Sequence, residues 1–79
     1  MKLSDTCELM NSADYKHRFL AEYYQLEIRI SKLSDMLINW NNLTFVPKCS
    51  YDFFNGQLKA MEMYMSYLEA RAIKEEIEI

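Results

Sequence analysis

The stretch FLAEYYQLEIRISKLSDMLINW, residues 19–40, decides the fold. It contains neither Gly nor Pro, and large apolar side chains recur in it at intervals of four and three residues. These positions are Phe19, Tyr23, Leu26, Ile30, Leu33, Leu37 and Trp40. Such heptad spacing places them all on one side of a helix. It predicts a long amphipathic helix over residues 12–40, with Ser12 and Asp14 as candidate N-caps.

The chain after this helix predicts a loop and then a second helix. Paired Asn residues and Pro47 disfavour helix, which places a loop over residues 41–49. We expect its apolar side chains to fold back over the end of the helices: Leu43, Phe45 and Val46. Ser50 is the predicted N-cap of a second helix over residues 50–75.

The second helix carries two neighbouring rows of side chains. Its seam is Phe54, Leu58, Met61, Met65, Leu68 and Ala72. The row beside it is Phe53, Gln57, Ala60, Tyr64, Tyr67 and Arg71. Two such rows make a face wider than one partner helix can cover. We therefore predict an all-α fold, an antiparallel hairpin of two long amphipathic helices that assembles as a homo-oligomeric helical bundle. The spacing leaves open whether the seams close within one chain or between subunits.

The ends of the chain are less regular. Residues 1–11 show no clean period, so we expect a loose N-terminal arm, with room for one helical turn, before a single domain over residues 12–79. The last residues, IKEEIEI, fit either a continued helix or, over residues 77–79, a short strand or extended arm. At 79 residues the chain has room for one domain at most.

Composition excludes several classes of function. The net charge is −3 and Lys and Arg are scattered, so general binding to DNA or RNA is not expected. No apolar run approaches the roughly 20 residues that span a bilayer. The first residues lack the apolar core of a secretory signal. We expect a cytoplasmic protein that makes no membrane contact.

Catalytic and metal chemistry also lack the residues they need. Cys7, Cys49 and the single His17 cannot supply a zinc-binding set, and we expect no metal and no cofactor. No neighbour is placed to orient His17 as a base, so we expect it to face solvent. Cys49 has no base beside it and is expected under the loop or at the helix cap. The chain is predicted not to be an enzyme.

One set of residues suggests ligand binding. Aromatic rings can stack on bases, and Arg side chains can grip phosphate with two hydrogen bonds. The candidate ligand-binding residues are Arg18, Tyr23, Arg29, Lys32, Tyr64, Tyr67 and Arg71. They would hold a small anionic nucleotide between subunits. The alternative is that the Tyr rings anchor subunit contacts while the Arg side chains pair with Glu22 or Glu69.

Most of the chain resembles a known family. The segments DYKHRFLAEYYQLEIRISKLSDML (14–37), FVPKC (45–49), QLKAMEMYMSYLEARA (57–72) and IEI (77–79) are similar to short phage and prophage proteins named after a crAss-like phage gene. The chain departs from that pattern at Ser50, where the family has Pro, and at Glu76, where it has Gly. The second departure bears on the shape of the C-terminal tail.

The resemblance implies a phage accessory protein that acts in an infected or lysogenic bacterium. Small helical phage proteins include oligomeric sponges, which bind nucleotide signals of bacterial immunity, and this chain is similar to them in size and build. By analogy with the architecture of these sponges, we expect an anti-defence role: sequestration of a cyclic oligonucleotide or an ADP-ribose derivative without turnover. The alternative is a protein–protein interaction module, either an adaptor or inhibitor of a host protein or a small structural phage component.

Overall fold

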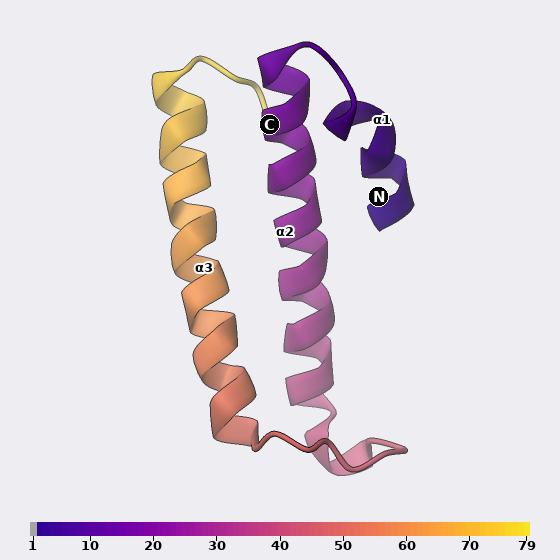
Figure 1. The fold of residues 1–79 in the computed structure, drawn as a ribbon. Coiled ribbons are helices and arrows are strands. Elements are labelled where there is room, and N and C mark those ends of the chain that lie inside the picture. Colours follow the sequence, from indigo (N-terminus) through magenta and orange to yellow (C-terminus); the bar gives the residue numbers. More distant parts are fainter. Residues whose placement is uncertain (1) are drawn as a thin grey trace.

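The computed structural model describes residues 2–79 and confirms the antiparallel helical hairpin. Helix α2 (Tyr15–Ile38) and helix α3 (Tyr51–Lys74) run side by side in opposite directions, as Figure 1 shows. A 3₁₀ turn, η2 (Trp40–Asn42), opens the connection between them. None of the helices described is both long and apolar enough to cross a membrane.

Both long helices begin at the N-caps that the sequence indicates. The Asp14 carboxylate accepts a hydrogen bond from the backbone N–H of Lys16 at 2.8 Å. The Ser50 hydroxyl accepts one from the backbone N–H of Phe53 at 3.2 Å. Each cap satisfies a donor that the first helical turn leaves free, which explains why the helices start where they do.

The two seams meet within one chain. The buried core holds Phe19 and Leu26 from α2 against Leu68 and Ala72 from α3, and Leu68 has no exposed surface. Tyr23, Ile30, Met61 and Met65 pack around this core and stay partly exposed. The heptad seams of α2 and α3 therefore pack against each other within one chain.

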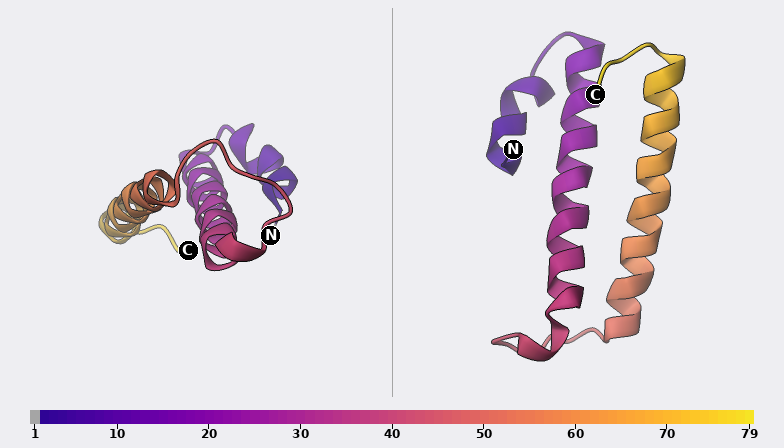
Figure 2. Two further views of the ribbon diagram at one scale, coloured as in Figure 1. Left: turned by 90° about the horizontal axis from the view of Figure 1, so that it is seen from below. Right: turned by 180° about the vertical axis from the view of Figure 1, so that it is seen from behind.

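The N-terminal arm is helical where the structure describes it. Residues expected to be loose form a 3₁₀ turn, η1 (Leu3–Thr6), and a short helix, α1 (Cys7–Met10), while Met1 lies outside the described residues. Thr6 anchors the arm: it is fully buried, and its hydroxyl accepts a hydrogen bond from Gln25 Nε2 at 2.9 Å. Figure 2 shows α1 beside α2 on the side away from α3.

The loop at the other end differs from expectation. Phe45 and Val46 are 57% and 91% exposed, so they do not cover the end of the hairpin. Trp40 does so instead: its ring meets Tyr51 edge-on at 5.5 Å and packs 6.1 Å from Phe54. One large ring buries more apolar surface than two exposed loop side chains, of which Val46 is kept out of the helical region by Pro47.

The C-terminal tail neither continues the helix nor forms a strand. After α3 ends at Lys74, Glu76 adopts a left-handed conformation with φ 55°. The N–H of Ile77 then bonds to the carbonyl of Ala72 at 2.8 Å, which brings the Ile77 side chain back into the core. Figure 1 shows this tail crossing toward the start of α2.

The described part of the chain forms a thin slab. Its principal extents are 42 × 24 × 16 Å, so its smallest dimension is little more than the width of one helix. Figure 2 shows the helices side by side in one layer.

Candidate functional site

A groove with a basic rim runs between α2 and α3 near the loop end of the hairpin. Its volume is about 330 Å³. It is lined by Arg29, Lys32, Leu33, Met36, Phe54, Gln57 and Met61, and we call it the basic groove. Arg29 and Lys32 form no salt bridge with any residue from 2 to 79. Their donors are therefore free to bind an anion.

The other residues of the basic groove complement these cations. Phe54 and Met61 supply an apolar wall from α3, and Gln57 supplies an amide that can donate or accept hydrogen bonds. An aromatic wall beside two cations suits a ligand with a flat ring and a phosphate. The sequence singled out Arg29 and Lys32 but missed Phe54 and Gln57. Phe54 and Gln57 lie on the two neighbouring rows of the second helix, and this position could have indicated that they face the groove.

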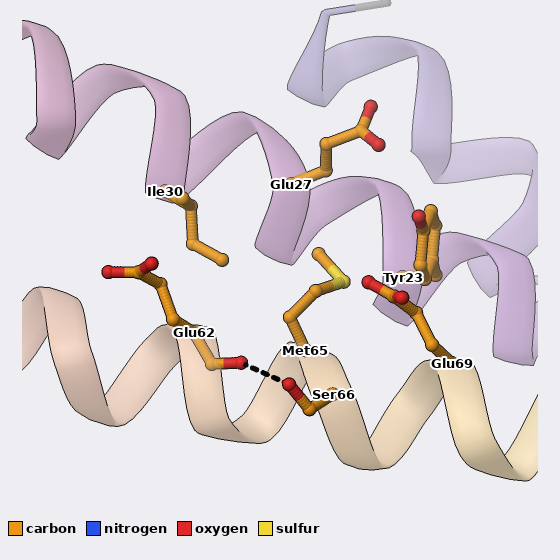
Figure 3. Close-up of a pocket in the computed structure, with 7 residues that line it drawn as sticks. All are labelled: Tyr23, Glu27, Ile30, Glu62, Met65, Ser66 and Glu69. Carbon is orange, nitrogen blue, oxygen red and sulfur yellow. Dashed lines mark hydrogen bonds between the residues drawn. The ribbon is translucent and has the colours of Figure 1, made fainter.

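A second groove carries the opposite charge. It has a volume of about 360 Å³ and is lined by Tyr23, Glu27, Ile30, Glu62, Met65, Ser66 and Glu69, as Figure 3 shows. We call it the acidic groove. Its three carboxylates repel phosphate, so an anionic ligand is not favoured there.

The two grooves open on opposite sides of the hairpin. Glu27 lines the acidic groove and Arg29 the basic groove, and side chains two residues apart on a helix point about 160° away from each other. Tyr23 lies on the acidic side, next to Glu69 in Figure 3. Burial raises the pKa of the Tyr23 hydroxyl, and the charges of Glu27 and Glu69 raise it further.

Arg71 is already occupied by neighbours in its own chain. Its guanidinium donates to the Tyr15 hydroxyl at 2.6 Å and lies 3.8 Å from carboxylate oxygens of both Glu22 and Glu75. It also lies 5.0 Å from the centre of the Phe19 ring. The hydrogen bond to Tyr15 is the largest of the effects that raise the pKa of Arg71. Pairing with Glu22, the alternative considered from the sequence, is therefore observed.

The remaining predicted ligand residues lie apart from the basic groove. Arg18 donates to the backbone carbonyls of Ser12 and Ala13, at 3.1 and 2.9 Å, where it closes the turn before α2. Tyr64 and Tyr67 stand on α3 with 44% and 67% of their surfaces exposed. Within one chain, the structure brings Arg29 and Lys32 to one groove and leaves the other five elsewhere.

Neither of the two residues considered for catalysis lines that groove. The Ser12 hydroxyl lies 3.0 Å from His17 Nδ1, and Cys49 is exposed in the loop rather than packed under it. Among residues 2–79, no group of three His, Cys, Asp or Glu side chains is arranged to hold a metal ion.

Comparison with protein families gives one match. The family model described as Sequestin matches residues 13–74, which includes all of α2 and α3 and therefore both grooves. Comparison with curated proteins and with solved structures gives no match.

Proposed function

Because the chain belongs to the Sequestin family, we propose that it sequesters a small nucleotide signal and releases it unchanged. Membership of a family with this name suggests sequestration rather than catalysis. The ligand class we propose is a cyclic oligonucleotide or an ADP-ribose derivative that serves as an immune signal. The biological setting we propose is that of a phage accessory protein, which counters defence in the cytoplasm of an infected or lysogenic bacterium.

The observation that carries this proposal is that two cations at the basic groove form no salt bridge within the described residues 2–79. Arg29 and Lys32 lie one turn apart on α2, so both can reach the same phosphate or two phosphates of a pyrophosphate. The ring of Phe54 can stack on a base, and the amide of Gln57 can form hydrogen bonds with the edge of that base. A protein that only holds its ligand needs such contacts and needs no group to transfer a proton.

Charge on the rest of the hairpin supports the same choice of groove. The net charge is −3, and three carboxylates line the acidic groove. An anionic ligand is therefore repelled from that side and attracted to the side of Arg29 and Lys32. Arg71 contributes less, because Glu22 and Glu75 already neutralise it.

Binding by variants tests the proposal. Isothermal titration calorimetry would be run with cyclic di-adenylate and with ADP-ribose as separate probes. Arg29→Ala should weaken binding by about 10- to 100-fold, since a hydrogen bond to a charged group contributes about 1.5–3 kcal/mol. Lys59→Ala is the matched control, because Lys59 is exposed on α3, carries the same charge and lines neither groove.

Two further results complete the test. Arg29→Lys keeps the charge but loses the two-point contact, so it should bind between the wild type and Arg29→Ala. Mass spectrometry of the recovered ligand should show it unchanged. Equal affinity of Arg29→Ala and Lys59→Ala for a probe that binds the wild type would refute the assignment of the basic groove. Conversion of the probe would refute sequestration.

A further inference from the structure

Most of one face of α3 is left without a partner in the single chain. The row Phe53, Gln57, Ala60, Tyr64, Tyr67 and Arg71, which we call the outer row, lies beside the buried seam. Only Gln57, which lines the basic groove, and Arg71, which bonds to Tyr15 and pairs with Glu22 while 44% of its side chain stays exposed, also face α2. Phe53 is 66% exposed, and Met63, next to the row, is 64% exposed. Gly56 also borders it, and a Cβ at that position would meet no atom within 4 Å.

The slab shape leaves this face of α3 without a second layer of helices packed on it. Stable domains pack at least two layers of secondary structure, and this chain forms one layer only 16 Å thick. A second copy laid on the outer row would supply the second layer and complete a four-helix arrangement.

From the order of residues on the outer row we infer that its partner is a second copy of this chain, with the two α3 helices antiparallel about a two-fold axis near residue 62. In that register each position meets a complementary one: Phe53 meets Arg71, Gln57 meets Tyr67, and Ala60 meets Tyr64. A ring faces a cation at the ends, and a small side chain faces a large one at the centre.

Charge supports the antiparallel direction. The first turn of α3 carries Asp52, and its last turn carries Lys74 besides Arg71, whose charge Glu22 and Glu75 already offset. A two-fold axis brings the acidic start of each helix to the basic end of the other, and it also opposes the two helix dipoles favourably. A parallel pair would place like charges together.

The surface available matches a modest dimer. Buried aromatic side chains cover 150–250 Å² each, so the exposed parts of Phe53, Tyr64 and Tyr67 amount to roughly 400 Å² per copy. Met63, Ala60 and Gly56 extend this patch. Two copies then approach the lower end of the size range of specific interfaces.

The inference deepens the proposed function and rests on it in one respect. Gln57 belongs both to the outer row and to the basic groove. In the inferred register Tyr67 of the partner subunit packs at Gln57, at the edge of that groove. The partner would thus supply an aromatic ring for stacking on a base, while Arg29 and Lys32 hold the phosphates. The pairing thus adds one of the predicted aromatic residues, Tyr67 of the partner subunit, to the site of Arg29 and Lys32.

Sedimentation equilibrium of the full chain tests the pairing. Wild type should have the mass of two chains. Ala60→Glu should have the mass of one, because a carboxylate would be buried opposite Tyr64 without a partner. Ser66→Glu is the matched control, since Ser66 is exposed and lines the acidic groove on the other side. Circular dichroism would confirm that both variants keep their helices.

A disulfide experiment tests the register. With both native cysteines replaced by Ser, the Ala60→Cys/Tyr64→Cys variant should oxidise to a cross-linked dimer, whereas a lone Ser66→Cys should not. A monomeric wild type, or an Ala60→Glu variant that is still dimeric, would overturn the inference. A monomeric wild type that instead holds a host protein on this face overturns it equally.

Calorimetry on the same samples separates the two proposals. Loss of nucleotide affinity by about tenfold or more in monomeric Ala60→Glu supports the contribution of the partner's Tyr67. Full affinity in that monomer refutes the shared site and leaves the basic groove intact as the binding site. A dimeric wild type that binds no nucleotide refutes the proposed function while the pairing stands.

Discussion

Replacing Glu76 by Gly should stabilise the protein. Glu76 has φ 55°, and the backbone around it forms two hydrogen bonds that close the end of α3. The N–H of Ile77 bonds to the Ala72 carbonyl at 2.8 Å, and the N–H of Glu76 bonds to the Ile73 carbonyl at 3.3 Å. This is a Schellman motif, in which the left-handed position is usually Gly.

The size of the effect follows from two opposing terms. A left-handed conformation costs a residue with a Cβ about 1–2 kcal/mol. Glycine avoids that strain but loses about 0.5–1 kcal/mol more conformational entropy on folding. The net gain for Glu76→Gly is therefore about 0.5–1 kcal/mol. In a domain of this size that raises Tm by about 2–8 °C.

Thermal unfolding followed by circular dichroism, at one fixed protein concentration, measures this gain. Glu76→Ala separates backbone strain from charge, because it removes the carboxylate near the negative end of the helix dipole but keeps the Cβ. Glu78→Gly makes the same chemical change two residues later. If Glu76→Gly melts no higher than Glu76→Ala, left-handed strain at this position is not what limits stability, and our reasoning is wrong.

Three further predictions concern the core, the arm and pH. Leu68→Ala should lower the free energy of unfolding in urea by about 2–5 kcal/mol, because Leu68 is fully buried; a loss under 1 kcal/mol would contradict the core as described. Thr6→Val keeps the side-chain shape but removes the hydroxyl that bonds Gln25, so hydrogen exchange should quicken over residues 2–10 while the long helices keep their protection. The pKa of Tyr23 is raised from its ordinary value of 10.0, so its protonated form stabilises the fold below that pH, and the contribution disappears as pH rises through the folded pKa. Tyr23→Phe should therefore reduce the fall in Tm above pH 10, and an unchanged fall would show that this group does not contribute.

The hairpin could be predicted from the sequence because its determinants are local and periodic. The intervals of four and three residues fix which side of each helix is apolar, and the caps fix where each helix begins. The structure adds that the seams meet within one chain, with Phe19 and Leu26 against Leu68 and Ala72. Spacing alone cannot distinguish that from a contact between subunits, because both bury the same side of the helix.

The N-terminal arm could not be predicted in this way. A segment as short as Leu3–Met10 shows too few turns for a period to be recognised. It is held by a polar contact, since Thr6 is buried and bonds to Gln25 from nineteen residues further along the chain. Pairs of polar side chains far apart in sequence leave no pattern that periodicity can detect.

The candidate site was predicted in part. Tyr23 and Arg29 were predicted to share a site because an aromatic ring and a cation together suit a nucleotide. The helix separates them: Tyr23 lines the acidic groove and Arg29 the basic groove. Side chains six residues apart on a helix point about 120° away from each other, so a helical projection of α2 would have separated them. The engagement of Arg71 by Tyr15 could not have been inferred, since these residues meet only through the tertiary fold.

The cations of the hairpin divide into those that hold the fold together and those that do not. Arg18 closes the turn before α2 by bonding to two carbonyls, and Arg71 joins α2 to α3 through Glu22 and Tyr15. Removing either cation alters the folded chain, so lost ligand affinity in such variants would not identify a binding site. Arg29 and Lys32 pair with no carboxylate from residue 2 to residue 79, so changing them should leave stability nearly unaltered. A loss of ligand affinity on changing Arg29 or Lys32 therefore reflects a lost contact with the ligand rather than a change in the fold. For this reason the decisive variants are those at the basic groove.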